Sequence, residues 1–199
     1  MSIQTASFFT FANQNPALVS RRSFLTTSSG LLLSGTAIAL LAGEEALAKK
    51  APGGSVESDV RILNTALGAE LEAIAAYQVG AESGLLQKPV LDLAVLFQSQ
   101  HKEHADLLGK TVSKLGGKPV TAKAKYGFPT EKLKTQEDVL RFAAQLEQGA
   151  VSAYLGAVPV FGNRDLAKAA ASILGDEAMH LAILRQALGE APVPSAFVS

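Results

Sequence analysis

Residues 63–77 read LNTALGAELEAIAAY, and this stretch decides the fold class. Its apolar residues recur at alternating intervals of three and four, as they do along the packed seam of a helical bundle. The spacing that starts at Leu63 runs through Glu70 and ends at Tyr77. One position in the middle of an otherwise apolar helix face is therefore a carboxylate.

Three more segments have the same spacing, and helix-breaking residues separate all four. We predict helices over residues 58–83, 89–115, 136–158 and 164–188. The residues expected to begin them are Ser58, Pro89, Thr135 and Asn163. Short connections make the first two helices antiparallel, and likewise the last two. Residues 116–135 are long enough to cross the bundle, so we predict an all-α, up-down-down-up four-helix bundle with one long crossover between its second and third helices.

Each predicted seam is apolar except in its middle. There the spacing places acidic or imidazole side chains, namely Glu70, His101, His104, Glu147, Glu177 and His180. Burying ionised carboxylates without a partner is costly, and no Lys or Arg occupies any of the four seams. All six groups lie at similar heights along their helices, so one layer of the bundle can hold them. One or two divalent cations would neutralise this layer. The alternatives are hydrogen-bonded core histidines and carboxylates that are partly exposed.

The polar residues also follow a two-helix repeat. Glu precedes Tyr by seven residues in the first and third helices, in the pairs Glu70–Tyr77 and Glu147–Tyr154. The second and fourth helices instead contain His101-x-x-His104 and Glu177-x-x-His180. We interpret Tyr77 and Tyr154 as candidates for hydrogen bonding to metal ligands, with plain aromatic packing as the alternative. The neighbouring acids Glu72, Glu103 and Asp176 are expected to face solvent.

This arrangement resembles the ferritin-like superfamily of four-helix bundles. In that family two helices each supply one Glu, and the other two each supply Glu-x-x-His, around a di-iron or di-manganese centre. Residues 63–77 look like the first helix of bacterial exported ferritin-like domains, and residues 175–181 look like their fourth. The resemblance covers about residues 58–188. It implies a di-iron or di-manganese cofactor and no organic cofactor, while the third imidazole of the layer makes zinc or copper a further option by the general order of metal affinities.

The resemblance also assigns roles residue by residue. Glu70 and Glu147 match the single-Glu positions, Glu177 and His180 match one Glu-x-x-His motif, and His104 matches the His of the other. The departure is His101, where the family pattern has Glu. The expected metal ligands are thus three Glu and three His rather than four Glu and two His.

Residues 1–48 have the order of regions found in a secretory signal peptide. Ser20-Arg21-Arg22-Ser23-Phe24-Leu25 precedes an apolar stretch over residues 31–43, and Ala46-Leu47-Ala48 supplies a cleavage pattern. The paired arginines resemble the twin-arginine export signal, which implies the twin-arginine (Tat) export machinery as a partner and a periplasmic location. The apolar stretch would span roughly 20 Å, too short for a bilayer core of about 30 Å. We therefore expect no stable membrane insertion after cleavage, with a permanent amino-terminal anchor as the alternative.

These patterns divide the chain into four parts. Residues 1–48 form the signal peptide, cleaved after Ala48, and residues 49–57 form a linker. Residues 58–188 form the bundle, and residues 189–199 form a carboxy-terminal tail.

The composition excludes several other functions. The chain has 18 Lys and Arg against 18 Asp and Glu, a balance that argues against a nucleic-acid partner. It contains no Cys, which excludes disulfides, zinc–thiolate sites, iron–sulfur clusters and thiol nucleophiles. A homodimer is left open.

Three functions fit these observations. The first is a dimetal redox enzyme that activates dioxygen or peroxide. The second is a non-catalytic protein that sequesters a metal such as zinc or iron, or is stabilised by it. The third is a structural or interaction bundle whose polar layer is hydrogen-bonded without any metal. The metal-binding motif alone does not separate the first two.

Overall fold

The structure, a computed structural model, describes residues 55–199. The predicted signal peptide and residues 49–54 of the predicted linker lie outside the described residues, and the last two linker residues, 56 and 57, belong to the first helix. Within them the chain forms four long helices and no strand. The helices are α2 (Val56–Glu82), α3 (Lys88–Lys114), α4 (Gln136–Ala157) and α5 (Arg164–Ala187). Their bounds lie within two residues of those expected, and the all-α prediction is confirmed.

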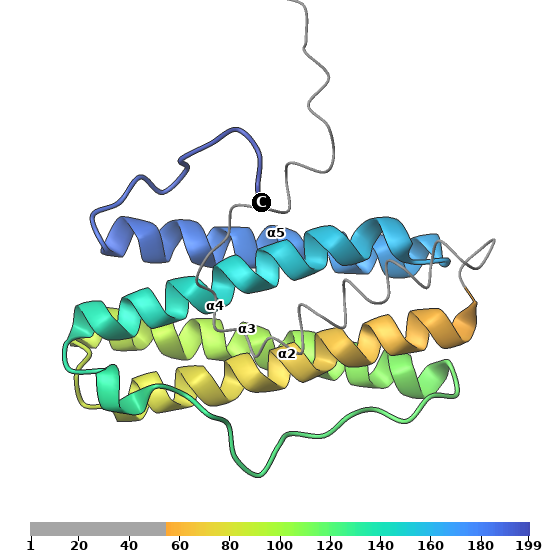
Figure 1. Ribbon diagram of the computed structural model, residues 1–199, viewed down its shortest axis with the longest axis horizontal. Coiled ribbons are helices and arrows are strands. Elements are labelled where there is room, and N and C mark those ends of the chain that lie inside the picture. The colour runs from red at the N-terminus through yellow and green to blue at the C-terminus, as the bar shows by residue number, and fades with distance from the viewer. Residues whose placement is uncertain (1–54) are drawn as a thin grey trace, which may run out of the picture. The chain divides into compact units, whose positions relative to one another are not determined.

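The topology is that of a bundle with one long crossover (Figure 1). Helices α2 and α3 lie side by side and antiparallel, and so do α4 and α5. Residues 115–135 return along the bundle, so that α4 runs in the same direction as α3. This return contains a single short 3-10 turn, η2 (Thr130–Lys132). The predicted up-down-down-up order is confirmed.

The helix ends follow local capping chemistry. The prediction that Ser58 caps the first helix is wrong: the N-cap is Ser55, whose side chain accepts a hydrogen bond from the Ser58 backbone N–H. Ser58 itself lies buried in the first turn. At α4, Thr135 and Asp138 form the reciprocal bonds of a capping box, as the sequence indicated. Asn163 caps α5 by accepting from the Asp165 backbone N–H.

The first residues of the crossover, 117–120, are fastened to α2. The Asn64 side-chain amide donates to the Lys118 carbonyl at 3.0 Å and accepts from the Val120 backbone N–H at 2.9 Å. A Cβ at Gly117 would lie 2.5 Å from Val60, so only glycine allows this close approach to α2. These contacts help to offset the conformational entropy that is lost when a long loop is held in one conformation.

A buried carboxylate joins the two helix pairs at one end of the bundle. Asp59, on the first turn of α2, accepts hydrogen bonds from the backbone N–H groups of Gly162 at 2.8 Å and Asn163 at 3.0 Å. These two residues follow the short 3-10 turn η3 (Val158–Val160) and lead into α5. Asp59 therefore fixes the start of α5 relative to α2.

Two apolar clusters flank the middle of the bundle. One contains Ile62, Leu67, Leu108, Val112 and Ile173, and the other contains Tyr77, Phe97, Leu140 and Leu184. Each cluster draws on residues from all four helices or their immediate ends. The polar layer lies between the clusters in sequence position on every helix. In residues 55–199, no helix has the length and apolar character needed to cross a membrane.

Candidate metal centre

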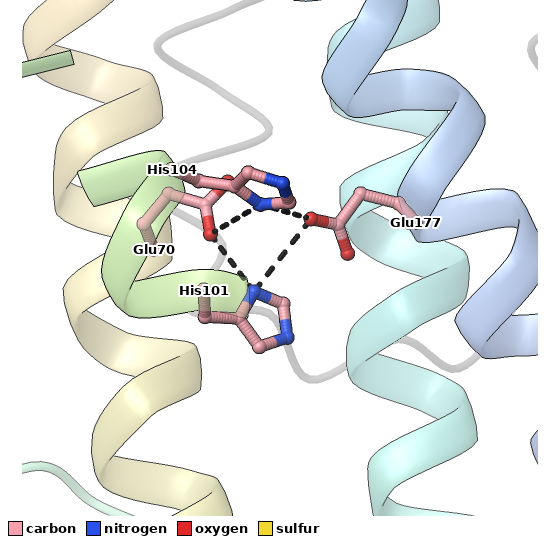
Figure 2. Close-up of side chains that lie close together, drawn as sticks. All are labelled: Glu70, His101, His104 and Glu177. Atoms are coloured by element: carbon pink, nitrogen blue, oxygen red, sulfur yellow. Dashed lines mark hydrogen bonds and ion pairs between the residues drawn. The ribbon is translucent and has the colours of Figure 1, made fainter. Parts of the chain in front are cut away.

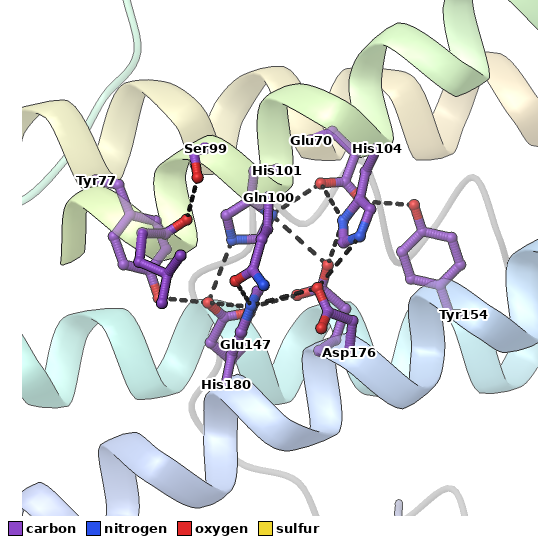
Figure 3. Close-up of polar contacts among 12 residues, drawn as sticks. Glu70, Tyr77, Ser99, Gln100, His101, His104, Glu147, Tyr154, Asp176 and His180 are labelled. Carbon is purple, nitrogen blue, oxygen red and sulfur yellow. Dashed lines mark hydrogen bonds and ion pairs between the residues drawn. The ribbon is translucent and has the colours of Figure 1, made fainter. Parts of the chain in front are cut away.

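The six polar seam residues meet in the middle of the bundle, where all four helices contribute; Figure 3 labels five of them, and Figure 2 labels the sixth, Glu177. Five of them have side chains at most 3% exposed, and His104 is 13% exposed. The members are Glu70 from α2, His101 and His104 from α3, Glu147 from α4, and Glu177 and His180 from α5. We call these residues the buried cluster.

One half of the buried cluster consists of Glu70, His101, His104 and Glu177 (Figure 2). The Nδ1 atom of His101 lies 2.8 Å from Glu70 Oε2 and 3.6 Å from Glu177 Oε1. The Nδ1 atom of His104 lies 3.6 Å from the same Glu70 oxygen and 3.1 Å from the same Glu177 oxygen. Two nitrogens and two oxygens thus surround one small volume. This is the first donor set.

The other half consists of His101, Glu147, Glu177 and His180. Here the Nε2 atom of His101 lies 3.2 Å from Glu147 Oε1. The Nδ1 atom of His180 lies 3.5 Å from that oxygen and 3.6 Å from Glu177 Oε2. This second donor set has the same composition as the first, and the two sets share His101 and Glu177.

Several donor atoms of the buried cluster have no hydrogen-bond partner. They are both carboxylate oxygens of Glu177, Glu147 Oε2, His104 Nδ1 and His180 Nδ1. Buried polar atoms without hydrogen-bond partners are rare, because each has lost its hydrogen bonds to water without gaining another, which costs free energy. All five are atoms of residues in the two donor sets. The orphaned atoms and the mixed O/N donor set fit a bound divalent cation.

Two buried tyrosines connect the single-Glu helices crosswise. The Tyr77 hydroxyl on α2 donates to Glu147 on α4, and the Tyr154 hydroxyl on α4 donates to Glu70 on α2 at 2.6 Å. Burial raises the pKa of both phenols, and the adjacent Glu147 and Glu70 charges raise it further. Both hydroxyls therefore stay protonated and remain donors to the carboxylates.

The outward nitrogens of His104 and His180 contact residues outside the six. Asp176 Oδ2 lies 3.3 Å from His104 Nε2 and 3.4 Å from His180 Nε2, and Gln100 Oε1 lies 2.9 Å from His180 Nε2. When a metal-binding His donates its outer N–H to such an oxygen, its inner nitrogen is left with a free lone pair. In both residues the inner nitrogen is Nδ1.

The prediction that Asp176 faces solvent is wrong. Its side chain is only 22% exposed and lies against two imidazoles. Gln100 was not singled out from the sequence. Both residues occur four positions before a cluster histidine, a spacing that puts two side chains on the same helix face. That spacing was the available signal. Of the other two neighbouring acids, Glu103 is exposed and Glu72 is half-buried.

Without a metal, the imidazoles and carboxylates perturb one another's protonation. Burial lowers the pKa of His101, but hydrogen bonds to Glu147 and Glu70 outweigh it and raise the value to about 11. The same opposition between burial and contacts with cluster carboxylates raises the pKa of His104 to about 10 and that of His180 to about 9. Burial raises the pKa of Glu147, but its hydrogen bond with His101 and its close contact with His180 lower it by more. The metal-free cluster therefore holds imidazolium–carboxylate pairs.

A cavity of about 40 Å³ lies between α2 and α4 and reaches the buried cluster. Its polar lining consists of Thr65, Glu70, Glu72, His101, Glu147 and Tyr154, and alanines form most of the rest: Ala66, Ala69, Ala73, Ala150, Ala153 and Ala157. The volume has room for about three water-sized molecules. Small side chains on both helices thus leave space next to three of the cluster residues.

The fold and the donor sets together define a helical bundle with a buried carboxylate–imidazole centre. A family model of the ferritin-like domain matches residues 58–190, and the chain belongs to this family. None of the curated proteins matches the sequence significantly.

Two solved structures show the same fold. One is a conserved hypothetical protein from Mycobacterium tuberculosis, 25% identical, with a TM-score of 0.62; the match covers 72% of this chain and 99% of that protein. The other is described as a ferritin-like, diiron-carboxylate protein from Bacillus anthracis, 22% identical, with a TM-score of 0.59. That match covers 67% of this chain and 96% of the neighbour.

Proposed function

We propose that this protein binds two metal ions in the buried cluster and uses them to react with dioxygen or peroxide. The observation that carries the proposal is the set of five buried donor atoms without a hydrogen bond, all of them on residues of the two donor sets. A hydrogen-bonded polar core would leave few such atoms, whereas two cations would use them.

Each metal ion would take its ligands from one donor set. Glu70 and His104 would hold the first ion, Glu147 and His180 would hold the second, and Glu177 would contribute to both. Iron or manganese suits mixed oxygen and nitrogen ligands, and the family neighbour described as a diiron-carboxylate protein makes iron the first metal to test. Such metals supply electrons to small oxidants, chemistry that the side chains of this cluster lack.

The protein residues would orient ligands and exclude water. Tyr77 and Tyr154 hold Glu147 and Glu70 by donating to one oxygen of each carboxylate. Asp176 contacts the outer nitrogens of His104 and His180, which directs their Nδ1 atoms inward. Phe97 stacks on the His180 ring with centroids 4.0 Å apart and closes one side of the site to water.

The cavity between α2 and α4 supports a small oxidant as the substrate. Its volume of about 40 Å³ suits molecules of the size of dioxygen or hydrogen peroxide, and it borders Glu70, His101 and Glu147. Its alanine lining would admit such molecules but no bulky organic substrate.

The proposed location is the periplasm, reached through the twin-arginine pathway. The support is the Arg21-Arg22 signal followed by an apolar stretch and the Ala46-x-Ala48 pattern. This pathway exports folded proteins, so the metal could be loaded before export. Fractionation of cells that express the full chain tests this point: Arg21→Lys with Arg22→Lys should retain the protein in the cytoplasm.

The redox proposal is tested by loading the purified protein anaerobically with Fe(II) and then adding oxygen or hydrogen peroxide. We expect iron oxidation faster than that of free Fe(II) under the same conditions. Glu177→Gln should abolish the acceleration, and Glu103→Gln, an exposed acid on α3, should leave it unchanged. Oxidation no faster than in buffer would overturn the redox proposal.

A second candidate is a non-catalytic metal-binding protein. The observation in its favour is His101, because a third imidazole shifts the donor sets toward metals such as zinc. Tight zinc binding that raises the unfolding temperature, together with no acceleration of iron oxidation, would favour this candidate over the first.

A further inference from the structure

The two ring nitrogens of His101 contact different halves of the buried cluster. Nδ1 lies 2.8 Å from Glu70 Oε2, in the first donor set. Nε2 lies 3.2 Å from Glu147 Oε1, in the second. The ring is 1% exposed and stands between the two sets. Each set therefore receives one nitrogen from the same side chain.

His101 differs in this respect from the other two histidines. His104 and His180 each turn Nδ1 toward the cluster and Nε2 toward Asp176, as an end-on ligand does. In the described part of the chain, the polar contacts of both His101 nitrogens are to cluster carboxylates. Both ring nitrogens of His101 therefore face the buried cluster, whereas His104 and His180 each turn only one nitrogen toward it.

Glu177 is related to the two donor sets in the same way. Its Oε1 lies 3.1 Å from His104 Nδ1, and its Oε2 lies 3.6 Å from His180 Nδ1. His101 and Glu177 also occupy equivalent motif positions, each three residues before a histidine on the second helix of its pair. Each of these two residues thus presents one donor atom to each set.

We propose that His101 bridges two metal ions. Nδ1 binds the ion held by Glu70 and His104, and Nε2 binds the ion held by Glu147 and His180. This inference rests on the proposed dimetal function, and it adds that a bridging imidazole stands where the family pattern has a bridging carboxylate.

The charges and protons balance. In the metal-free cluster the His101 ring is an imidazolium with an N–H at each nitrogen, so binding two ions breaks both N–H bonds and releases two protons to solvent. No electron is transferred in this step. Three carboxylates and one imidazolate carry four negative charges, which match two divalent cations. A neutral imidazole would leave the pair of ions with one uncompensated positive charge in a buried site.

A bridging imidazole separates the ions more than a bridging carboxylate does. Two metal–nitrogen bonds of about 2.0 Å on opposite sides of a ring place the ions roughly 6 Å apart. Carboxylate- and oxygen-bridged pairs are typically about 3.5–4 Å apart. The separation of the ions therefore distinguishes the two kinds of bridge.

The direct test is the crystal structure of the protein loaded with Zn(II) alone, with the ions located by anomalous scattering. We expect two peaks on opposite sides of the His101 ring, each about 2.0 Å from one nitrogen. Zinc bound with His101 attached through one nitrogen, or through none, would overturn the bridge while leaving metal binding intact. Absence of zinc from the buried cluster would instead count against the proposed function itself.

X-ray absorption at the zinc edge supplies a second readout in solution. The wild-type protein should show imidazole scattering but no zinc–zinc distance near 3.5–4 Å, and His101→Glu, which restores the family pattern, should introduce that short distance. A short zinc–zinc distance in the wild-type protein contradicts the bridge, whether or not the variant folds.

Discussion

The two helix pairs, α2–α3 and α4–α5, present nearly the same residues to the centre of the bundle. Three equivalences hold between them: Glu70 with Glu147, Tyr77 with Tyr154, and His104 with His180. The fourth position breaks the match, because His101 on α3 corresponds to Glu177 on α5. The backbone arrangement is repeated, but the charge is not.

This difference shows which half of the cluster depends more on a cation. Both nitrogens of His101 are hydrogen-bonded to carboxylates, whereas neither oxygen of Glu177 has a hydrogen-bond partner. Glu177 has only ion-pair contacts with imidazole nitrogens at 3.1–3.6 Å, and a buried carboxylate that accepts no hydrogen bond is costly in a protein interior. We therefore expect removal of the metal to destabilise the surroundings of Glu177 on α5 more than those of His101 on α3.

Replacing Glu177 should have the largest effect. Glu177→Gln removes a charged ligand from both donor sets, and we expect metal affinity to fall roughly 100-fold or more. Elemental analysis after dialysis measures the loss. Glu103→Gln, on the exposed surface of α3, is the matched control and should keep its metal. Equal metal content in the two variants would contradict the role given to Glu177.

The crossed tyrosines test whether the two halves are equivalent. Tyr77→Phe and Tyr154→Phe each remove one hydrogen bond to a cluster carboxylate. We expect each to weaken metal binding by roughly 10- to 100-fold, and by similar factors. Tyr126→Phe, in the crossover, is the control. Competition with a chromogenic chelator measures the affinities, and a change in only one of the two cluster variants would show that the halves differ.

Metal removal should lower thermal stability. A ligand present at about 100 times its dissociation constant stabilises the native state by about 2.7 kcal/mol. For a bundle of this size, that corresponds to roughly 5–10 °C in unfolding temperature. Scanning calorimetry of the metal-loaded protein with and without a chelator measures the shift. The same chelator should leave the unfolding temperature of Glu177→Gln unchanged, and an equal shift there would mean that the stabilising ion lies elsewhere.

The metal-free protein should lose stability as the pH rises. The folded-state pKa values of His101, His104 and His180 are raised to about 11, 10 and 9 from an ordinary value of 6.5. Their contribution is thus fully present below pH 6.5 and is lost as the pH rises through these values. Carboxylates from α2, α4 and α5 face these rings and cause the raised values.

Urea unfolding in the presence of a chelator checks this sign. The free energy of unfolding should fall from about pH 6.5 to pH 9 in the metal-free protein. His104→Gln should show a shallower fall, because one of the three titrating rings is gone. A free energy that rises over this interval would show that the imidazoles are neutral in the folded protein.

Much of the fold was readable from the sequence because it rests on local signals. The seam spacing around Glu70 and Glu147 predicted the helices, and Thr135 and Asn163 marked two of their starts. Ser55 and Ser58 could each have capped α2, because both are serines with the same capping side chain, so residue type alone does not distinguish them. Which serine caps depends on where the helix begins to pack.

The cluster was predicted from the seam, but its surroundings were not. Asp176 lies next to a seam position, so seam spacing alone assigned it to solvent, although it lies four residues before His180. The role of Asp59 depends on Gly162, which is 103 residues away in the sequence. A contact of that kind arises only from tertiary packing.

The most direct test of the central claim is the number of metal ions that the metal-free protein takes up. Native mass spectrometry after addition of Fe(II), Mn(II) or Zn(II) counts them for each chain. The two donor sets predict uptake of two divalent ions by the wild-type protein and none by Glu177→Gln. A folded wild-type protein that takes up no ion would show that imidazolium–carboxylate pairs alone sustain the buried cluster, and would contradict the account.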